Sequence, residues 1–238
     1  MGKEQNFIFG RNPVREALKA ERVQSVYLAD SMNDQTILDE IKLQRISATR
    51  VSSNELTNMV KIDKHQGVVA VVKPYEYIDL NEIIRRSKSV KVPIILILDG
   101  INDPHNLGAI LRSCDVFNVS GIIIGKHNQV PLNATVAKTS AGAINFVPVA
   151  LVNNINNALE KLKENGFWVV STDGASTTNY YDLKYDFPVA LVVGSEGEGI
   201  SRLVLKNSDY IVKIPQYGHV NSLNASVATA ILLSRIRS

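Results

Sequence analysis

The amino-acid sequence predicts an α/β protein, and two features of its second half carry this prediction. An uninterrupted apolar run covers 94–98, and similar, largely apolar runs recur at 121–124, 167–170, 190–193 and 210–214. Such runs are typical of parallel strands that are covered on both faces. Segments with helical spacing alternate with them, at 107–117, 155–165 and 222–235. The alternation predicts a mainly parallel sheet with helices packed against it, within residues 92–238.

A smaller α/β unit is predicted for residues 1–74. Asn12 is an N-cap candidate, with Pro13 at the first helical position. Strand patterns follow at 25–29 and 67–72, and helical spacing covers about 37–46. Pro74 ends the last strand. The polar, basic stretch 75–91 is the expected linker, partly helical.

Composition excludes several classes of protein. The chain has 238 residues, 45% of them hydrophobic and 21% charged, as in ordinary globular proteins. No apolar run approaches the roughly 20 residues of a membrane span, and Met1–Gln5 lack a signal core. Cys114 is the only cysteine, which excludes an internal disulfide and a multi-cysteine zinc site. We expect a cytoplasmic protein with no metal site and no membrane partner.

The positive charge is concentrated in the first part of the chain. The net charge is +3, and residues 1–91 hold 15 Lys/Arg against 12 Asp/Glu, whereas the remaining residues balance. This asymmetry is compatible with a polyanionic partner. Taken alone, the asymmetry is better explained by an ordinary solvated surface.

Three loops after predicted strands carry unusual residues, and ligands of open α/β sheets bind beyond such strand ends. In the first loop Asn106 can cap the next helix, which also carries Arg112. A capped helix with a surface arginine remains the simpler interpretation of this segment. The second loop holds three glycines within 194–199, together with Glu196 and Glu198. Its spacing is neither G-x-G-x-x-G nor a P-loop, and its acids would repel phosphates. It suits a cationic ligand or a tight, solvated turn.

The third loop runs from a strand that ends at Ile214-Pro215 into a helix that begins at about Ser222. Ser222 and Asn224 would place polar groups near the N-terminus of that helix. Taken alone, this segment also suits ordinary helix capping.

Together the three segments resemble the signature motifs of the SpoU/TrmH family, in the SPOUT superfamily of RNA methyltransferases. The matching residues are Asn106-x-Gly108-x-x-x-Arg112, Gly194-Ser195-Glu196-Gly197-x-Gly199, and Ile214-Pro215 followed by Ser222-Leu223-Asn224-x-Ser226-Val227-Ala228. Residues 139–143 match a further conserved stretch of the family. Asn145-Phe146 departs from the acidic and polar pair that many relatives carry there.

The resemblance extends to the first unit. Residues 9–18 and 65–70 are similar to the N-terminal domain of the RlmB-type members, an RNA-binding fold like that of ribosomal protein L30e. Those members methylate a guanosine ribose in 23S (large-subunit) ribosomal RNA. The resemblance therefore implies a SPOUT α/β domain with a deep trefoil knot, a homodimer, and ribosomal RNA rather than DNA as partner.

The implied reaction moves a methyl group from S-adenosyl-L-methionine to a ribose 2′-hydroxyl. By motif position, the catalytic residues are Arg112, Asn106, Glu196, Ser222 and Asn224. The residues implied for cofactor binding are Gly194, Gly197, Ile214 and Leu223. Arginine is a poor general base because it stays protonated, so we expect Arg112 to orient the neighbouring phosphate or the 2′-oxygen.

Three alternatives remain open at this point. A transfer-RNA 2′-O-methyltransferase of the same family would carry the same catalytic motifs. A non-catalytic RNA-binding module would not need all five catalytic residues. A nucleotide-dependent oxidoreductase is disfavoured because the G-x-G-x-x-G fingerprint is absent.

Overall fold

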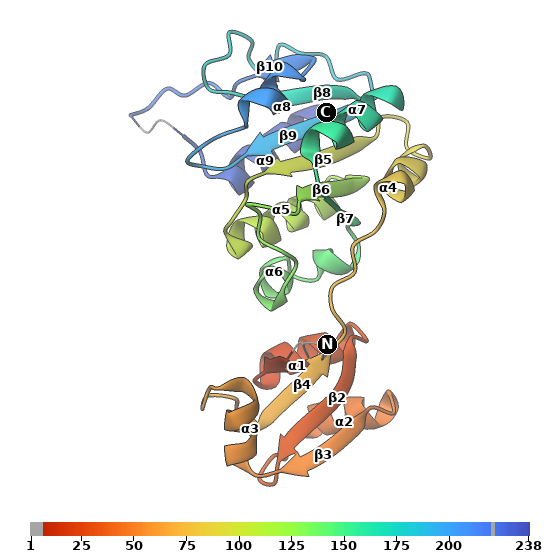
Figure 1. Cartoon of the computed structure of the whole chain (residues 1–238), viewed down its shortest axis with the longest axis vertical. Coiled ribbons are helices and arrows are strands. Elements are labelled where there is room, and N and C mark those ends of the chain that lie inside the picture. Colours follow the sequence, from red (N-terminus) through yellow and green to blue (C-terminus); the bar gives the residue numbers. More distant parts are fainter. Residues whose placement is uncertain (1–6, 220–221) are drawn as a thin grey trace. The chain divides into compact units, whose positions relative to one another are not determined.

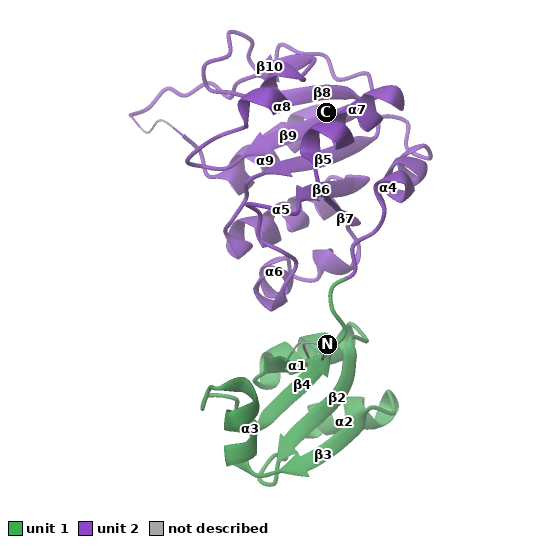
Figure 2. Ribbon diagram, in the orientation of Figure 1, with its two compact units in different colours: residues 1–75 green, residues 76–238 purple. Residues whose placement is uncertain are grey.

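The computed structural model describes residues 7–219 and 222–238 (Figure 1). We expected no secretion signal in Met1–Gln5, and these residues lie outside the described ranges. The chain divides into two compact units, 1–75 and 76–238 (Figure 2). Within the described ranges, no helix has the length and apolar character needed to cross a membrane.

Unit 1 is a mixed four-stranded sheet of order β1-β4-β2-β3 with three helices. Its strand β4 is antiparallel to β1 and β2, while β2 and β3 are parallel. The elements are β1 (Phe7–Phe9), α1 (Arg11–Lys19), β2 (Val23–Ala29), α2 (Gln35–Leu43), β3 (Ser47–Val51), α3 (Ser53–Val60) and β4 (Val68–Val72).

Helix α1 starts earlier than expected. Gly10 is its N-cap, with a φ of 88° that favours glycine, and its N–H donates to the Val68 carbonyl. Because this contact fixes the turn, Asn12 lies inside the first helical turn and is not the cap. Its Oδ1 accepts from Nη1 of Arg15 instead, at 3.4 Å.

Unit 2 is a six-stranded sheet of order β10-β8-β9-β5-β6-β7, in which every strand pair is parallel. This confirms the parallel sheet predicted from the apolar runs. The strands are β5 (Ile94–Asp99), β6 (Gly121–Gly125), β7 (Val149–Val152), β8 (Trp168–Thr172), β9 (Val189–Gly194) and β10 (Tyr210–Val212). The helices are α4 (Leu80–Ser87), α5 (Pro104–Val116), α6 (Ala134–Thr139), the 3-10 turn η1 (Ala143–Asn145), α7 (Ile155–Glu164), α8 (Arg202–Lys206) and α9 (Ala225–Arg237).

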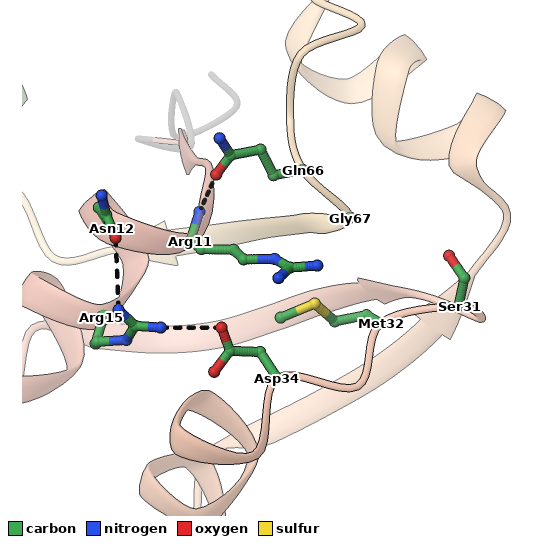
Figure 3. A pocket seen from close by; sticks show the side chains of 8 residues that line it. All are labelled: Arg11, Asn12, Arg15, Ser31, Met32, Asp34, Gln66 and Gly67. Carbon is green, nitrogen blue, oxygen red and sulfur yellow. Dashed lines mark hydrogen bonds and ion pairs between the residues drawn. The ribbon is translucent and has the colours of Figure 1, made fainter.

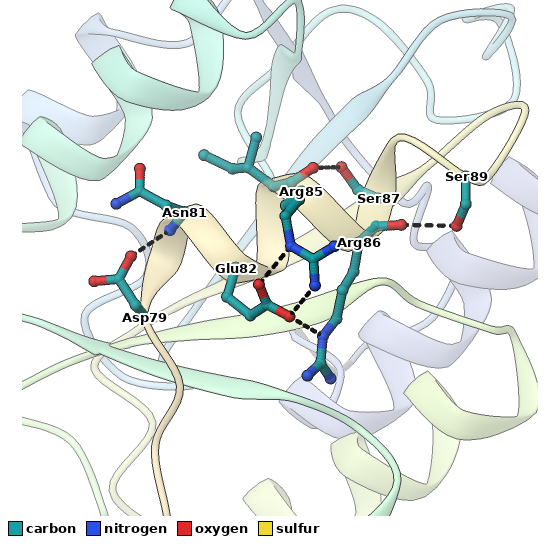
Figure 4. A network of polar contacts seen from close by, with 8 residues as sticks. Asp79, Asn81, Glu82, Arg85, Arg86, Ser87 and Ser89 are labelled. Carbon is teal, nitrogen blue, oxygen red and sulfur yellow. Dashed lines mark hydrogen bonds and ion pairs between the residues drawn. The ribbon is translucent and has the colours of Figure 1, made fainter.

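Helix α4 occupies the stretch from which we expected a linker. Ile83 and Ile84 are buried with residues of the unit 2 sheet, so this helix is part of the unit 2 core. On its outer side Glu82 accepts from both Arg85 and Arg86 (Figure 4). These two hydrogen-bonded arginines lower the pKa of Glu82 to about 2. Part of the basic charge noted in 75–91 is therefore already paired.

Helices α5 and α9 pack against each other over the core of unit 2. Leu232, Leu233 and Ile236 of α9 are buried there, as is Cys114 of α5. Arg237 fixes the end of α9, because its guanidinium donates to the carbonyls of Phe117, Val92 and Asn118 at 2.7, 2.8 and 2.6 Å. Helix α9 is thus anchored to the segment before β5 and to the turn after α5.

Candidate active site

The first turn of α5 presents Asn106 to the site because another residue caps the helix. Asp103 is the N-cap and accepts from the His105 N–H at 2.8 Å, and Pro104 occupies the first helical position. Asn106 was expected to be the cap, and the structure corrects this. Proline at the first helical position lacks the N–H that would be unsatisfied there, so Asp103-Pro104 is the favoured start.

Asn106, Glu196 and Asn224 form one hydrogen-bonded cluster, although 118 residues separate the first from the last. Oε1 of Glu196 accepts from Nδ2 of Asn106 at 3.1 Å, from Nδ2 of Asn224, and from the backbone N–H of Ala225 at 3.3 Å. Nδ2 of Asn224 also donates to Oδ1 of Asn106 at 2.8 Å. Glu196 and Asn224 are exposed and Asn106 is half-buried, so the cluster is open to a ligand. One oxygen of Glu196 organises both amides, and no described residue donates to its Oε2.

The loop that carries Glu196 closes on itself directly after β9. Ser195 and Gly199 exchange backbone hydrogen bonds at 3.1 and 3.2 Å. A Cβ on Gly194 would lie 2.2 Å from the Gly199 carbonyl carbon, so only glycine fits this crossing. Around Gly197, by contrast, a Cβ would meet nothing within 4 Å. Of the two glycines assigned to cofactor binding, only Gly194 must be glycine for the loop to pack as it does.

The third segment brings Asn224 to the start of α9. Its Oδ1 accepts from the N–H groups of Ser226 and Val227, so the helix begins at Ala225. The expected start at about Ser222 is corrected, because Asn224 supplies the cap. Ser222 and Leu223 are exposed in the preceding loop, and Ile214 packs against the unit 2 core. Ser222 makes no hydrogen bond with the described residues, and its neighbours 220–221 lie outside them.

Arg112 lies on the same helix as Asn106 but outside the cluster. Its side chain is exposed and has no hydrogen bond or ion pair within the described ranges. The structure therefore joins three of the five catalytic candidates directly. Arg112 and Ser222 are left available to a bound molecule.

Gly108 serves packing in the motif that it shares with Asn106. A Cβ there would lie 2.5 Å from Cβ of Thr139 and 2.9 Å from the Val136 carbonyl oxygen. Because α5 and α6 approach so closely, the motif serves two purposes. Asn106 belongs to the site, and Gly108 allows α5 to pack against α6.

A cleft of about 830 Å³ adjoins the cluster, between the loop after β5 and the loop after β9. Sequence reasoning missed most of its lining. Asp99 accepts from the Ser201 N–H at 2.9 Å and so ties the two loops together. Asn102, Asn128 and Arg202 also line the cleft. These residues could have been predicted from their positions after strands, because the carboxyl ends of parallel strands lie at the same edge of a sheet.

Comparison with known families identifies the second unit. Residues 93–234 match the model of the SpoU rRNA methylase family, which covers more than half of the chain. The chain belongs to the SpoU family. A second model, RNA 2′-O ribose methyltransferase substrate binding, matches residues 7–78.

Similar proteins agree with membership of the SpoU family. A protein of Staphylococcus haemolyticus, assigned to the TrmH family of tRNA/rRNA methyltransferases, is 41% identical over 98% of this chain and 95% of its own length. The SpoU methyltransferase AviRb of Streptomyces viridochromogenes, in complex with AdoMet, superposes with a TM-score of 0.78 at 22% identity. That match covers 97% of this chain and 88% of AviRb. The protein is an S-adenosylmethionine-dependent RNA methyltransferase.

The residues at the end of β9 and after β10 suit S-adenosylmethionine chemically. Gly194 brings bare backbone to the end of β9, and the apolar side chains of Ile214 and Leu223 would suit an adenine ring if the cofactor lies against them. The acids beside them, Glu196 and Glu198, would repel a phosphate but favour the sulfonium and ammonium groups of this cofactor. The backbone, apolar side chains and carboxylates at these positions are therefore compatible with S-adenosylmethionine.

Proposed function

We propose that the protein methylates the ribose 2′-hydroxyl of a guanosine in 23S ribosomal RNA. The observation that carries this proposal is the cluster of Asn106, Glu196 and Asn224, with the exposed Arg112 six residues further along α5. S-adenosylmethionine supplies an electrophilic methyl group when bound. What the chain itself must do is hold the ribose oxygen in line with that methyl group and exclude water.

Glu196 organises the cluster in this proposal. Its Oε1 is saturated by three N–H donors, so the two asparagine amides are held in fixed positions. Its Oε2 has no donor among the described residues, so it can accept a hydrogen bond from the ribose hydroxyl and take up the proton that this hydroxyl loses as its oxygen gains the methyl group. A carboxylate that is already oriented loses little entropy when it binds the substrate.

Arg112 orients the substrate backbone in this proposal. A guanidinium group stays protonated and matches a phosphate with two parallel hydrogen bonds, which a lysine cannot do. Arg112 therefore binds the phosphate next to the target ribose or holds the 2′-oxygen. Ser222 and Asn224 complete the site around the ribose.

The substrate assignment is supported by coverage of both units. The AdoMet-bound rRNA methyltransferase of Sinorhizobium meliloti matches 98% of this chain, with a TM-score of 0.76 and 24% identity. The TrmH/SpoU tRNA modifying enzyme of A. aeolicus matches only 66% of it, with a TM-score of 0.57 and 30% identity. Of these two solved structures, the one that shares both units is the one described as an rRNA methyltransferase, and this supports ribosomal RNA as the proposed substrate.

The proposal includes a homodimer and a deep knot in unit 2. Helices α5 and α9 leave Val116 and Val227 exposed, by 71% and 47%, which suits burial against a second copy. Dimerisation would also bring a partner surface to the open cluster. The knot is supported by α9, which returns from the edge strand β10 to pack on α5 and β9.

The deciding experiment is transfer of labelled methyl from S-adenosylmethionine to unmodified 23S ribosomal RNA, with transfer RNA in parallel. Nuclease digestion of the product should give 2′-O-methylguanosine, and Arg112→Ala should abolish the label. Label on transfer RNA alone would replace the substrate in the proposal. Label on a base would overturn the ribose assignment, and label on neither RNA would overturn the proposed function.

A further inference from the structure

We propose that a pocket in unit 1, at the start of α1, binds one nucleotide of the substrate RNA with its phosphodiester on Arg11. The inference rests on the proposed function only in taking RNA as the substrate. The pocket lies entirely within the first unit and is built by Arg11, Asn12, Arg15, Ser31, Met32, Asp34, Gln66 and Gly67 (Figure 3). Its volume is about 590 Å³, within the range of small-molecule sites.

One wall of the pocket is held in a fixed conformation by a buried histidine. His65 is only 3% exposed, and its Nδ1 accepts from the Gly67 N–H at 3.1 Å. Between them Gln66 has a φ of 56°, which is uncommon for a residue with a side chain. Backbone strain of this kind persists where the surroundings enforce it, and such positions gather at binding sites.

Gln66 joins that wall to the start of α1. Its Oε1 accepts from the backbone N–H of Arg11 at 2.9 Å, so it takes up one of the free donors of the helix N-terminus. Its amide NH₂ group has no acceptor among the described residues and is left available to a ligand.

The only acid of the pocket is already neutralised. Oδ2 of Asp34 accepts from Nη2 of Arg15 at 2.9 Å, and the Asp34 side chain is just 11% exposed. Nε of Arg15 is buried without a partner in the described part of the chain. With Asp34 paired, the charge that faces an incoming ligand is that of Arg11.

Arg11 is exposed, and Figure 3 shows its side chain extended across the pocket between Gln66 and Met32. Its guanidinium has no hydrogen bond or ion pair with residues 7–219 or 222–238. The groups around it without a partner among the described residues are the side-chain NH₂ groups of Gln66 and Asn12 and the hydroxyl of Ser31. Most of these groups donate, so the site favours an anion that is rich in acceptors.

A phosphodiester has that chemistry, and the volume leaves room for the attached nucleoside. Arg11, Asn12, Ser31 and Gln66 are all exposed, so the pocket opens to the surface. An open pocket admits a nucleotide that is still linked to its neighbours in a strand. We therefore assign the pocket to polymeric RNA, and a free nucleotide or inorganic phosphate is the rival source of the same chemistry.

The test uses the full chain, its Arg11→Ala and Arg11→Lys variants, and Lys42→Ala as control. Lys42 is an exposed cation of unit 1 outside the pocket. Binding to unmodified 23S ribosomal RNA transcript is measured by fluorescence anisotropy over a range of salt concentrations. Arg11→Ala should weaken binding about tenfold and lower the salt slope by roughly one. It should raise KM for RNA and leave kcat unchanged, and Arg11→Lys should restore the salt slope.

Equal binding by Arg11→Ala and the wild type, or an equal loss in Lys42→Ala, would overturn the proposal. GMP and inorganic phosphate are added as competitors. Suppose that Arg11→Ala abolishes binding of GMP or phosphate but leaves RNA binding unchanged. The ligand of the pocket is then the free anion, and the proposal is wrong. If the wild type transfers no methyl group but its RNA binding depends on Arg11, the proposed function fails and the pocket stands.

Discussion

The side chain of Asn224 performs two tasks with its two ends. Its Nδ2 donates to Glu196 and Asn106, while its Oδ1 caps α9 through Ser226 and Val227. One amide therefore both caps a helix and organises the candidate site, and two substitutions at Asn224 can separate capping from donation to Glu196 and Asn106.

Asn224→Asp should fold normally and lose activity. Aspartate caps helices as well as asparagine, but it cannot donate to Glu196 and adds a like charge beside it. We expect unfolding in urea within about 0.5 kcal/mol of the wild type and methyl transfer reduced at least tenfold. Asn224→Ala should lose the cap as well, at about 1 kcal/mol of stability. Full activity in Asn224→Asp would show that the donor is not needed.

Gly194→Ala should distort the loop after β9. Its new Cβ would lie 2.2 Å from the Gly199 carbonyl carbon, and overpacking of this kind costs about 1–3 kcal/mol. Calorimetry should show weaker binding of S-adenosylmethionine. Gly197→Ala is the matched control, because its Cβ meets nothing within 4 Å. The control should unfold like the wild type, and equal destabilisation of the two variants would contradict the geometry.

Arg112→Lys should reduce turnover while the protein stays folded. The variant keeps the charge but loses the planar fork that binds a phosphate through two hydrogen bonds. We expect kcat to fall about 100-fold, the size of effect seen when a preorganised donor is removed. Thermal unfolding should not change, since Arg112 is exposed. Near-normal kcat at saturating RNA would exclude the orienting role.

Arg237→Ala should destabilise unit 2 from the far end of α9. The substitution removes three hydrogen bonds from a charged group to the carbonyls of Phe117, Val92 and Asn118. Losing such bonds should cost about 2–3 kcal/mol, measured by urea unfolding. Arg237→Lys should recover only part of this, because one ammonium group cannot span all three carbonyls. Unchanged stability in both variants would show that the anchor is dispensable.

Cys114 should resist thiol reagents until the protein unfolds. Its side chain is fully buried, and burial, together with the neighbouring Asp115, raises its pKa far above the usual range. A raised thiol pKa means that the reactive thiolate is absent at pH 8, where an ordinary cysteine begins to ionise. Ellman's reagent should give no colour with native protein and one equivalent in denaturant. Rapid labelling of native protein would indicate that α5 opens locally.

Much of the fold was predictable because burial leaves a pattern in the sequence. The strands of unit 2 are covered on both faces, so β5, β6 and β9 are continuous apolar runs. β3 escaped prediction because four of its five residues are exposed and its sequence, SATRV, has no apolar pattern. Helix α4 was not separated from the expected linker, because its polar outer face outweighs the two buried isoleucines.

The sequence motifs predicted which residues belong to the candidate site, but not how their side chains contact one another. The motifs named Asn106, Glu196 and Asn224, yet no local pattern shows that residues 118 apart share hydrogen bonds. Capping was ambiguous because Asp103 and Asn106 can both cap a helix, and Pro104 decides between them. The pocket around Arg11 was missed, because it forms only when α1, the loop after β2 and the loop before β4 come together.

The position of α9 also has a consequence for how the enzyme is made. Among the described elements α9 leaves the ribosome last, and it brings both Asn224 and the Arg237 anchor. The cluster at Glu196 therefore cannot form until α9 has been synthesised, whereas every residue of the Arg11 pocket is made by the time the ribosome has passed Gly67. Since domains fold in the order of their synthesis, a nascent chain would be able to hold RNA before it could modify it.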